Sequence, residues 1–184
     1  REMILHENKN INLISQHTEV IARDRHIIDC AQIIDLIDEN HLSCVDLGSG
    51  SGLPGLVLAI IKKKQNSRMK FFLYEKSFKK SNFLKKVIKK FELNAEVINK
   101  DIYNQKKLSS DLIVARAFKP LPIILNLVSE NFDNFKDIIL FLGKSGKNSI
   151  EECLKKWNLE FIEKKSVTEK DSILIKINKV TKKR

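Results

Sequence analysis

Short apolar segments alternate with amphipathic ones along the chain from residue 43 onward. The apolar segments have the length of buried strands, and the amphipathic segments repeat apolar positions every three to four residues, as helices do. The predicted strands cover 43–47, 70–75, 95–98, 111–115 and 137–142, with two closing strands near Phe161 and over 172–177. The predicted helices cover 56–64, 77–91, 120–127 and 150–157.

Strands that alternate with helices form right-handed βαβ units. We therefore predict an α/β, Rossmann-like fold with a mainly parallel seven-stranded sheet and helices on both faces. Residues 1–40 carry a helical pattern and are predicted to form an N-terminal helical cap on an α/β core over 41–184. No repeat or long linker divides the chain, which predicts a single domain. Ligands of such folds bind beyond the carboxyl ends of the strands.

The composition is that of a globular domain with a strong basic excess. The 184 residues include 34 Lys and Arg but only 23 Asp and Glu, which gives a net charge of +11, and 42% of the residues are hydrophobic. Such an excess attracts polyanions, so nucleic acid is the leading partner class, with a lysine-rich solvated surface as the alternative. No apolar segment approaches the roughly 18 residues of a membrane span, and none resembles a secretory signal.

The three cysteines, Cys30, Cys44 and Cys153, lie far apart and form no CxxC pair. This spacing argues against both a disulfide framework and a zinc site. Cys44 falls inside an apolar strand, where a buried and inert thiol is expected. The sequence therefore predicts a cytoplasmic protein with no metal ion and no membrane contact.

A glycine-rich loop follows the first predicted strand, with the sequence Asp46-Leu47-Gly48-Ser49-Gly50-Ser51-Gly52-Leu53-Pro54-Gly55. Four glycines within eight positions let the backbone approach a ligand closely, because side chains would block that approach. The helix that follows directs its N–H groups toward the same place. The loop is therefore predicted to hold a nucleotide cofactor.

Two cofactors compete for this loop. The residues from Gly50 to Gly55 satisfy GxGxxG, the dinucleotide fingerprint, but this register begins two residues after the turn that Gly48 makes. Asp46, just before the glycines, opposes a pyrophosphate and suits the ammonium group of S-adenosylmethionine (SAM). Glu75, at the end of the second strand, suits ribose hydroxyls in both SAM and NAD. We expect SAM, and an NAD-binding oxidoreductase remains the alternative.

Further segments resemble the RsmG family, also called glucose-inhibited division protein B, over residues 5 to about 145. The loop with its Leu53-Pro54-Gly55 ending is one of the similar blocks. The others are Asn12-Leu13-Ile14-Ser15, Arg25-His26-Ile27-Ile28-Asp29-Cys30, Lys79-Lys80-Ser81-Asn82-Phe83-Leu84 and Ala115-Arg116-Ala117-Phe118. The blocks occur in the family's order and spacing.

The resemblance implies a class I SAM-dependent methyltransferase that modifies N7 of one guanosine in 16S ribosomal RNA, with the 30S subunit as partner. It also implies SAM contacts at Gly48 and Leu53, an adenine contact at Asp101-Ile102, and a further cofactor contact at Arg116. Glu7 stands where the family has Trp, and the segment Leu142-Gly143-Lys144 differs from the family's Leu-Lys-Gly. The expected cofactor-binding residues are Asp46, Gly48, Gly50, Gly52, Leu53, Glu75, Asp101, Ile102 and Arg116.

Methyl transfer to guanine N7 needs no general base, because N7 carries a lone pair and no proton. Alignment then supplies most of the catalysis, and Arg116 is the expected orienting residue. It could hold the methionine carboxylate, guanine O6 or a phosphate, or form a buried pair with Asp46 or Glu75. Phe118 could stack on the target base or belong to the core, and His26 is expected to pack or hydrogen-bond.

The expected RNA contacts are Arg25, Lys79, Lys80, Phe118 and Lys144. The lysines of the helix predicted over 77–91 form a basic face opposite its apolar face. Such a face is as typical of a solvated helix as of a phosphate contact. The alternative function is a SAM-dependent methyltransferase acting on a small molecule or a protein. Nothing in the sequence requires an oligomer, and no obligate protein partner is indicated.

Overall fold

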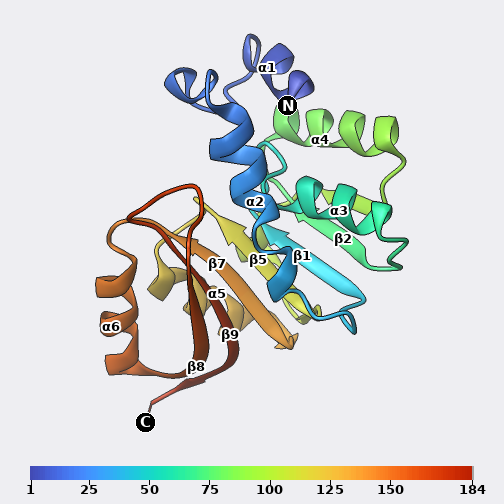
Figure 1. The fold of residues 1–184 in the computed structure, drawn as a ribbon. Coiled ribbons are helices and arrows are strands. Elements are labelled where there is room, and N and C mark those ends of the chain that lie inside the picture. The colour runs from blue at the N-terminus through green and yellow to red at the C-terminus, as the bar shows by residue number, and fades with distance from the viewer. Residues whose placement is uncertain (184) are drawn as a thin grey trace.

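A seven-stranded sheet forms the centre of the protein, for which a computed structural model describes residues 1–183 (Figure 1). The strand order is β3-β2-β1-β5-β7-β9-β8, in which β9 runs antiparallel to β7 and β8 and the other pairs are parallel. The strands are β1 (Ser43–Leu47), β2 (Lys70–Tyr74), β3 (Ala95–Ile98), β5 (Leu112–Arg116), β7 (Asp137–Leu142), β8 (Trp157–Lys165) and β9 (Ile173–Lys182). The strand order reverses between β1 and β5, which places a ligand crevice there.

Helices cover both faces of the sheet, as predicted: α3 (Gly55–Lys64), α4 (Phe78–Phe91), α5 (Leu121–Asn131) and α6 (Gly146–Lys156). Successive residues of a buried strand point to opposite faces. Ile113 of β5 therefore packs with Leu125 of α5. Its neighbour Val114 packs in a second core with Leu58 of α3. The predicted mainly parallel fold is confirmed.

The element boundaries differ from the predicted ones mainly near the C-terminus. The helix predicted to end at Trp157 ends at Lys156, and Trp157 begins β8. Strand β9 continues to Lys182, because it pairs with β8 along the edge of the sheet. Two short strands, β4 (Leu108–Ser109) and β6 (Phe132–Asn134), pair with each other and were not predicted, since segments this short carry no periodicity.

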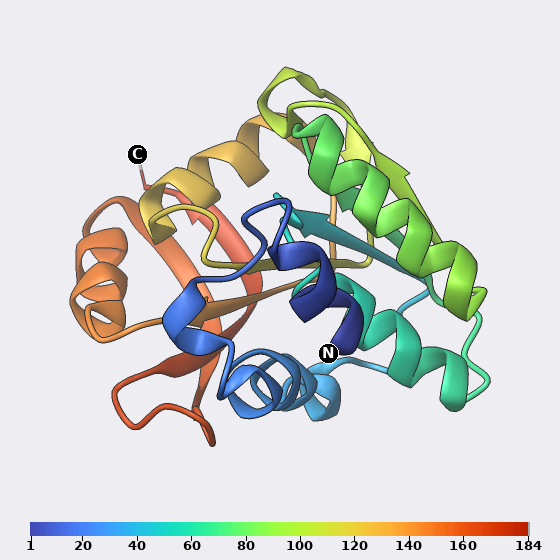
Figure 2. The same cartoon turned by 90° about the horizontal axis from the view of Figure 1, so that it is seen from above.

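The N-terminal cap consists of short helical pieces: α1 (Glu2–Asn8), η1 (Gln16–Thr18), the π-helix η2 (Arg23–Ile28), α2 (Asp29–Ala31) and η3 (Ile34–Leu36). Figure 2 looks down on the end of the molecule where α1 and the segment after it lie above the strands. A small apolar cluster ties the cap to the glycine-rich loop, with Ile14 and Cys30 packing against Leu53 and Val57. Within residues 1–183, no helix is both long and apolar enough to span a membrane.

Candidate active site

The glycine-rich loop begins directly after β1, where the backbone turns at Gly48. The backbone φ angles of Gly48, Gly50 and Gly52 are 64°, 57° and 84°, the left-handed region that favours glycine. A Cβ atom on Gly52 would lie 2.2 Å from the Leu56 side chain, so that position is closed by packing. A Cβ on Gly50 would meet nothing closer than the Gly48 carbonyl oxygen at 3.8 Å. The space above Gly50 is therefore open to a ligand.

Glu75, immediately after β2, is buried beside this loop. Its Oε2 atom accepts a hydrogen bond of 2.8 Å from the Gly50 N–H, and its Oε1 atom accepts one of 2.7 Å from the Ser77 N–H. Each carboxylate oxygen has a further lone pair for a ligand hydroxyl. The side chain thus fixes the loop and still fits the ribose contact predicted for it.

A pocket of about 250 Å³ lies beyond the carboxyl ends of the first three strands. We call it the β1–β3 pocket, and its lining includes Gly48, Glu75, Asp101, Ile102, Tyr103 and Phe118. Ile102 is buried, and the Asp101 carboxylate accepts a hydrogen bond from the Tyr103 N–H at 3.2 Å. The rings of Tyr103 and Phe118 stack with centroids 6.3 Å apart. The pocket offers an apolar wall and a carboxylate, which suits an adenosine group.

Asp46 is almost completely buried under the loop. Its Oδ2 atom accepts a hydrogen bond of 3.1 Å from the Gly55 N–H, whereas Oδ1 has no hydrogen-bond partner among the described residues. Burial raises the pKa of this carboxyl group to about 7. An unsatisfied buried carboxylate oxygen beside an open glycine loop fits a cationic ligand group, such as the ammonium of SAM.

Arg116, the last residue of β5, is held by the cap. Its Nε atom donates to Asp29 Oδ2 at 2.7 Å, and its Nη2 atom donates to the Arg25 carbonyl oxygen at 2.8 Å. The alternative of a buried ion pair is thus present, but its partner is neither Asp46 nor Glu75. The partner is Asp29, which comes from the cap, so the order of the strands alone could not reveal it.

His26 belongs to the same buried network. Its Nε2 atom lies 2.9 Å from Thr18 Oγ1, and its Nδ1 atom lies 3.4 Å from Arg116 Nη2. Burial and then the charge of Arg116 lower its pKa to about 4. The imidazole is therefore neutral at pH 7. This agrees with the hydrogen-bonding role expected for it.

A second pocket, of about 390 Å³, lies beyond the carboxyl ends of β5 and β7, between the cap and the start of β9. We call it the β5–β7 pocket, and its lining includes Arg25, Asp29, Arg116, Phe141, Gly143 and Ser172. Residues 116–119 connect the two pockets, since Arg116 and Ala117 line this one while Phe118 and Lys119 line the β1–β3 pocket. The site therefore has two adjoining compartments.

The residues predicted to contact RNA are not all brought together. Arg25 lines the β5–β7 pocket, whereas Phe118 is half-buried beside Gly48 in the β1–β3 pocket. Lys79 and Lys80 lie at the start of α4, and Lys144 is exposed in the turn after β7; none of the three lines either pocket. Sequence reasoning did not single out Asp29, Tyr103 or Ser172. Of these, only Asp29 lay within a segment that the resemblance had marked.

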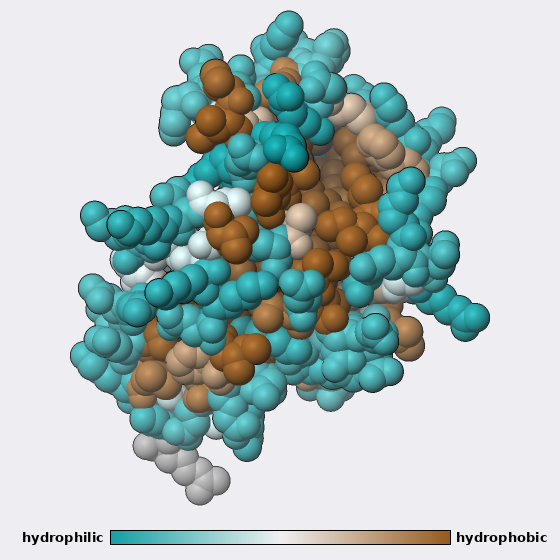
Figure 3. All heavy atoms as spheres, viewed as in Figure 1, coloured by the Kyte–Doolittle hydropathy of each residue, from teal (hydrophilic) through white to brown (hydrophobic). Residues whose placement is uncertain are grey.

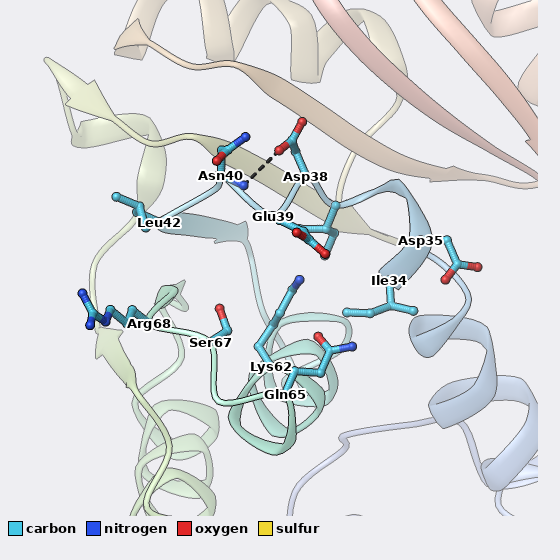
Figure 4. A pocket seen from close by; sticks show the side chains of 11 residues that line it. Ile34, Asp35, Asp38, Glu39, Asn40, Leu42, Lys62, Gln65, Ser67 and Arg68 are labelled. Carbon is cyan, nitrogen blue, oxygen red and sulfur yellow. Dashed lines mark hydrogen bonds between the residues drawn. The ribbon is translucent and has the colours of Figure 1, made fainter.

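Among the hollows outside this two-compartment site, two stand out, one by its volume and one by its apolar lining. One, of about 1020 Å³, lies at the opposite end of β1 and β2, with Leu42, Lys62 and Arg68 in its lining (Figure 4). The other is an apolar groove between α1 and helices α3 and α4, visible as a brown hollow in Figure 3. Neither has Glu75 or Arg116 in its lining.

The glycine loop, the carboxylate after β2 and the strand order define a class I SAM-dependent methyltransferase. A family model described as rRNA small subunit methyltransferase G (GidB) matches residues 1–176. The chain belongs to this family. It is 49% identical over 183 residues to the ribosomal RNA small subunit methyltransferase G of Pelagibacter ubique, covering 98% of this chain and 86% of that protein. The protein of the same name from Rickettsia bellii is 32% identical, with 99% and 91% covered.

Solved structures of methyltransferases share the fold. A SAM-dependent methyltransferase from Aquifex aeolicus superposes with a TM-score of 0.62 at 12% identity, covering 85% of this chain and 91% of that chain. M. capricolum TrmK, solved with S-adenosylhomocysteine, superposes with a TM-score of 0.58 at 18% identity, covering 91% and 70%. SAM is the cofactor of this chain, and the NAD alternative is set aside.

Proposed function

We propose that this chain transfers the methyl group of SAM to N7 of a guanosine in 16S ribosomal RNA. The observation that carries the proposal is the β5–β7 pocket, which adjoins the cofactor compartment through residues 116–119 in a member of this family. In open α/β sheets, ligands bind beyond the carboxyl ends of the strands at the switch in strand order. The target base occupies this second compartment, and the cofactor occupies the first.

The residues around the glycine loop each bind a different part of the cofactor. Glu75 accepts hydrogen bonds from the ribose hydroxyls, and Ile102 packs against the adenine near Asp101. Asp46 pairs with the ammonium group through Oδ1, which has no hydrogen-bond partner among the described residues. Gly48, Gly50 and the Leu53 backbone approach the methionine part, whereas Gly52 packs against Leu56 and holds the turn. When bound, SAM supplies an electrophilic methyl group on its sulfonium.

The reaction needs no proton transfer by the protein. The N7 lone pair forms the new N–C bond as the S–C bond breaks, which yields S-adenosylhomocysteine and a cationic 7-methylguanosine. The neutral His26 engages Thr18 within the cap, and no base is required of it. Catalysis thus depends on holding the base at the correct angle and distance.

Arg116 orients the guanine. Its Nε and Nη2 atoms are engaged by the cap, whereas Nη1 has no hydrogen-bond partner among residues 1–183. We assign this free N–H to guanine O6, the acceptor beside N7. A donor at O6 leaves the N7 lone pair free for the methyl group. The ion pair with the buried Asp29 keeps the guanidinium in place.

The basic surface holds the RNA around this site. The net charge of +11 attracts the phosphate backbone. Lys79, Lys80 and Lys144 contact phosphates outside the two pockets, and Arg25 does so at the mouth of the β5–β7 pocket. We propose that the enzyme acts as a monomer in the cytoplasm on the 30S subunit or its RNA, without an obligate protein partner.

The decisive experiment measures transfer of a labelled methyl group from SAM to 30S particles and to naked 16S RNA. The modified position is then mapped by chemical cleavage at N7-methylguanosine. We expect one labelled guanosine. Label on a protein or a small molecule, with none at any guanine N7, would refute the proposal and favour the alternative substrate classes.

A further inference from the structure

Arg25, which lines the β5–β7 pocket, forms an ion pair with Glu169, which does not line it. Arg25 Nη1 lies 2.6 Å from Glu169 Oε2, and the two side chains are 35% and 43% exposed. Arg25 belongs to the π-helix η2, whereas Glu169 lies in the loop between β8 and β9, 144 residues later in the chain. A guanidinium in the lining of the proposed base pocket is thus already paired with a carboxylate.

We propose that Arg25 binds the backbone phosphate of the target nucleotide, and that the Glu169 carboxylate occupies this phosphate site when RNA is absent. The inference rests on the proposed function. The Arg25 carbonyl oxygen accepts a hydrogen bond of 2.8 Å from Arg116 Nη2, so the two arginines form one connected unit. A nucleotide whose base meets Arg116 therefore brings its own phosphate toward Arg25.

The exchange requires only the Glu169 side chain to move. The surrounding loop is anchored separately, since Thr168 Oγ1 donates to Asp29 Oδ1 at 2.5 Å and the Val167 N–H donates to Gln32 Oε1 at 2.9 Å. A half-exposed ion pair contributes little to stability. An arginine binds a phosphate through two parallel charge-assisted hydrogen bonds. RNA binding thus replaces the weak ion pair between Arg25 and Glu169 with a stronger contact between Arg25 and a phosphate.

Neutralising the carboxylate tests the competition. Glu169→Gln is expected to lower the KM for 30S particles, and the dissociation constant for 16S RNA in filter binding, about two- to fivefold. Glu160→Gln is the matched control, because it removes the same charge from the same hairpin, where Glu160 pairs with the exposed Lys179 at 2.9 Å. We expect it to leave both constants unchanged.

A double-variant cycle shows whether the effect passes through Arg25. Arg25→Met is expected to weaken RNA binding about tenfold without changing SAM affinity. Adding Glu169→Gln to it should then have no further effect. The inference is overturned if Glu169→Gln behaves like Glu160→Gln, or if its benefit persists in the Arg25→Met background. A parent chain that binds RNA but does not methylate it refutes the proposed function alone, since the binding arm still reports on Arg25.

Discussion

The two compartments of the active site are built in different ways. The β1–β3 pocket takes its lining mainly from the short segments that directly follow β1, β2 and β3, together with the turn after β5. The β5–β7 pocket draws on the cap, on the ends of two strands and on the loop before β9. The cofactor compartment is therefore mostly a local feature of consecutive βα turns. The β5–β7 pocket, the proposed site of the base, exists only when distant parts of the chain meet.

Two glycines provide the sharpest test of this division. Gly50 lies within the glycine-rich loop and Gly143 lines the β5–β7 pocket, and a Cβ atom on either would enter open space. Gly50→Val should weaken SAM binding at least about 100-fold, because the side chain enters the cofactor space, while backbone strain costs about 1–2 kcal/mol of stability. Gly143→Val should raise the KM for RNA about tenfold and leave SAM affinity unchanged.

Calorimetry with SAM and steady-state kinetics with 30S particles measure the two effects separately. Thermal unfolding of each variant shows that it remains folded. If Gly143→Val weakens SAM binding as strongly as Gly50→Val does, the two compartments are not separate. If Gly50→Val binds SAM normally, the assignment of the loop is wrong.

Replacing Arg116 distinguishes its possible roles at the junction of the compartments. Arg116→Lys keeps a positive charge beside the buried Asp29, which avoids the roughly 3–5 kcal/mol cost of an unpaired buried carboxylate. It loses the planar fork of donors. We predict a kcat about 10- to 100-fold lower with an unchanged SAM dissociation constant. A large rise in the SAM dissociation constant would instead assign Arg116 to the methionine carboxylate.

The proposed pairing of Asp46 with the ammonium group of SAM predicts that SAM binding depends on pH. Burial raises its pKa to about 7, and a bound ammonium group would favour the ionised form. SAM binding should therefore release a proton near pH 7, and affinity should rise from pH 6 to pH 7.5 by about three- to tenfold relative to Asp46→Asn. Calorimetry in two buffers of different ionisation enthalpy measures the released proton. Equal proton release by the variant would contradict the pairing.

The Asp46 carboxyl group should make SAM affinity rise with pH, but its contribution to the stability of the fold should fall with pH. Because its pKa in the folded state lies above its ordinary value, the folded state binds more protons than the unfolded chain does. The contribution of Asp46 to the free energy of unfolding should be full below its ordinary pKa and be lost as the pH rises through about 7. Asp46→Asn should remove this contribution in urea unfolding experiments.

The smallest predicted effect concerns the surface outside both compartments. Lys79 and Lys80 begin α4 near the carboxyl end of β2, whereas Lys89 and Lys90 lie at the far end of the same helix. Replacing the first pair with Met should raise the KM for RNA about two- to fivefold and reduce its salt dependence. Replacing the second pair should change neither. Equal effects from both pairs would mean that the lysines act only through net charge.

The sequence predicted those features of the fold and the site that depend on residues close together in the chain. The alternation of strands and helices predicted the fold, and the spacing of glycines after β1 predicted the cofactor loop, because both depend on neighbouring residues. The Asp29–Arg116 pair joins residues 87 positions apart, and no periodic pattern reports such a contact. The short strands β4 and β6 and the length of β9 were missed for a related reason, since pairing along an edge depends on the partner strand.

The use of the β8–β9 loop in the β5–β7 pocket also sets the order in which the linings of the two pockets are synthesised. The β1–β3 pocket uses no residue beyond Lys119, whereas the β5–β7 pocket extends to Leu174. As the chain leaves the ribosome from its N-terminus, every residue of the cofactor compartment is therefore present before the base compartment can close. The residues that line the β1–β3 pocket are thus all synthesised before the last residues that line the β5–β7 pocket.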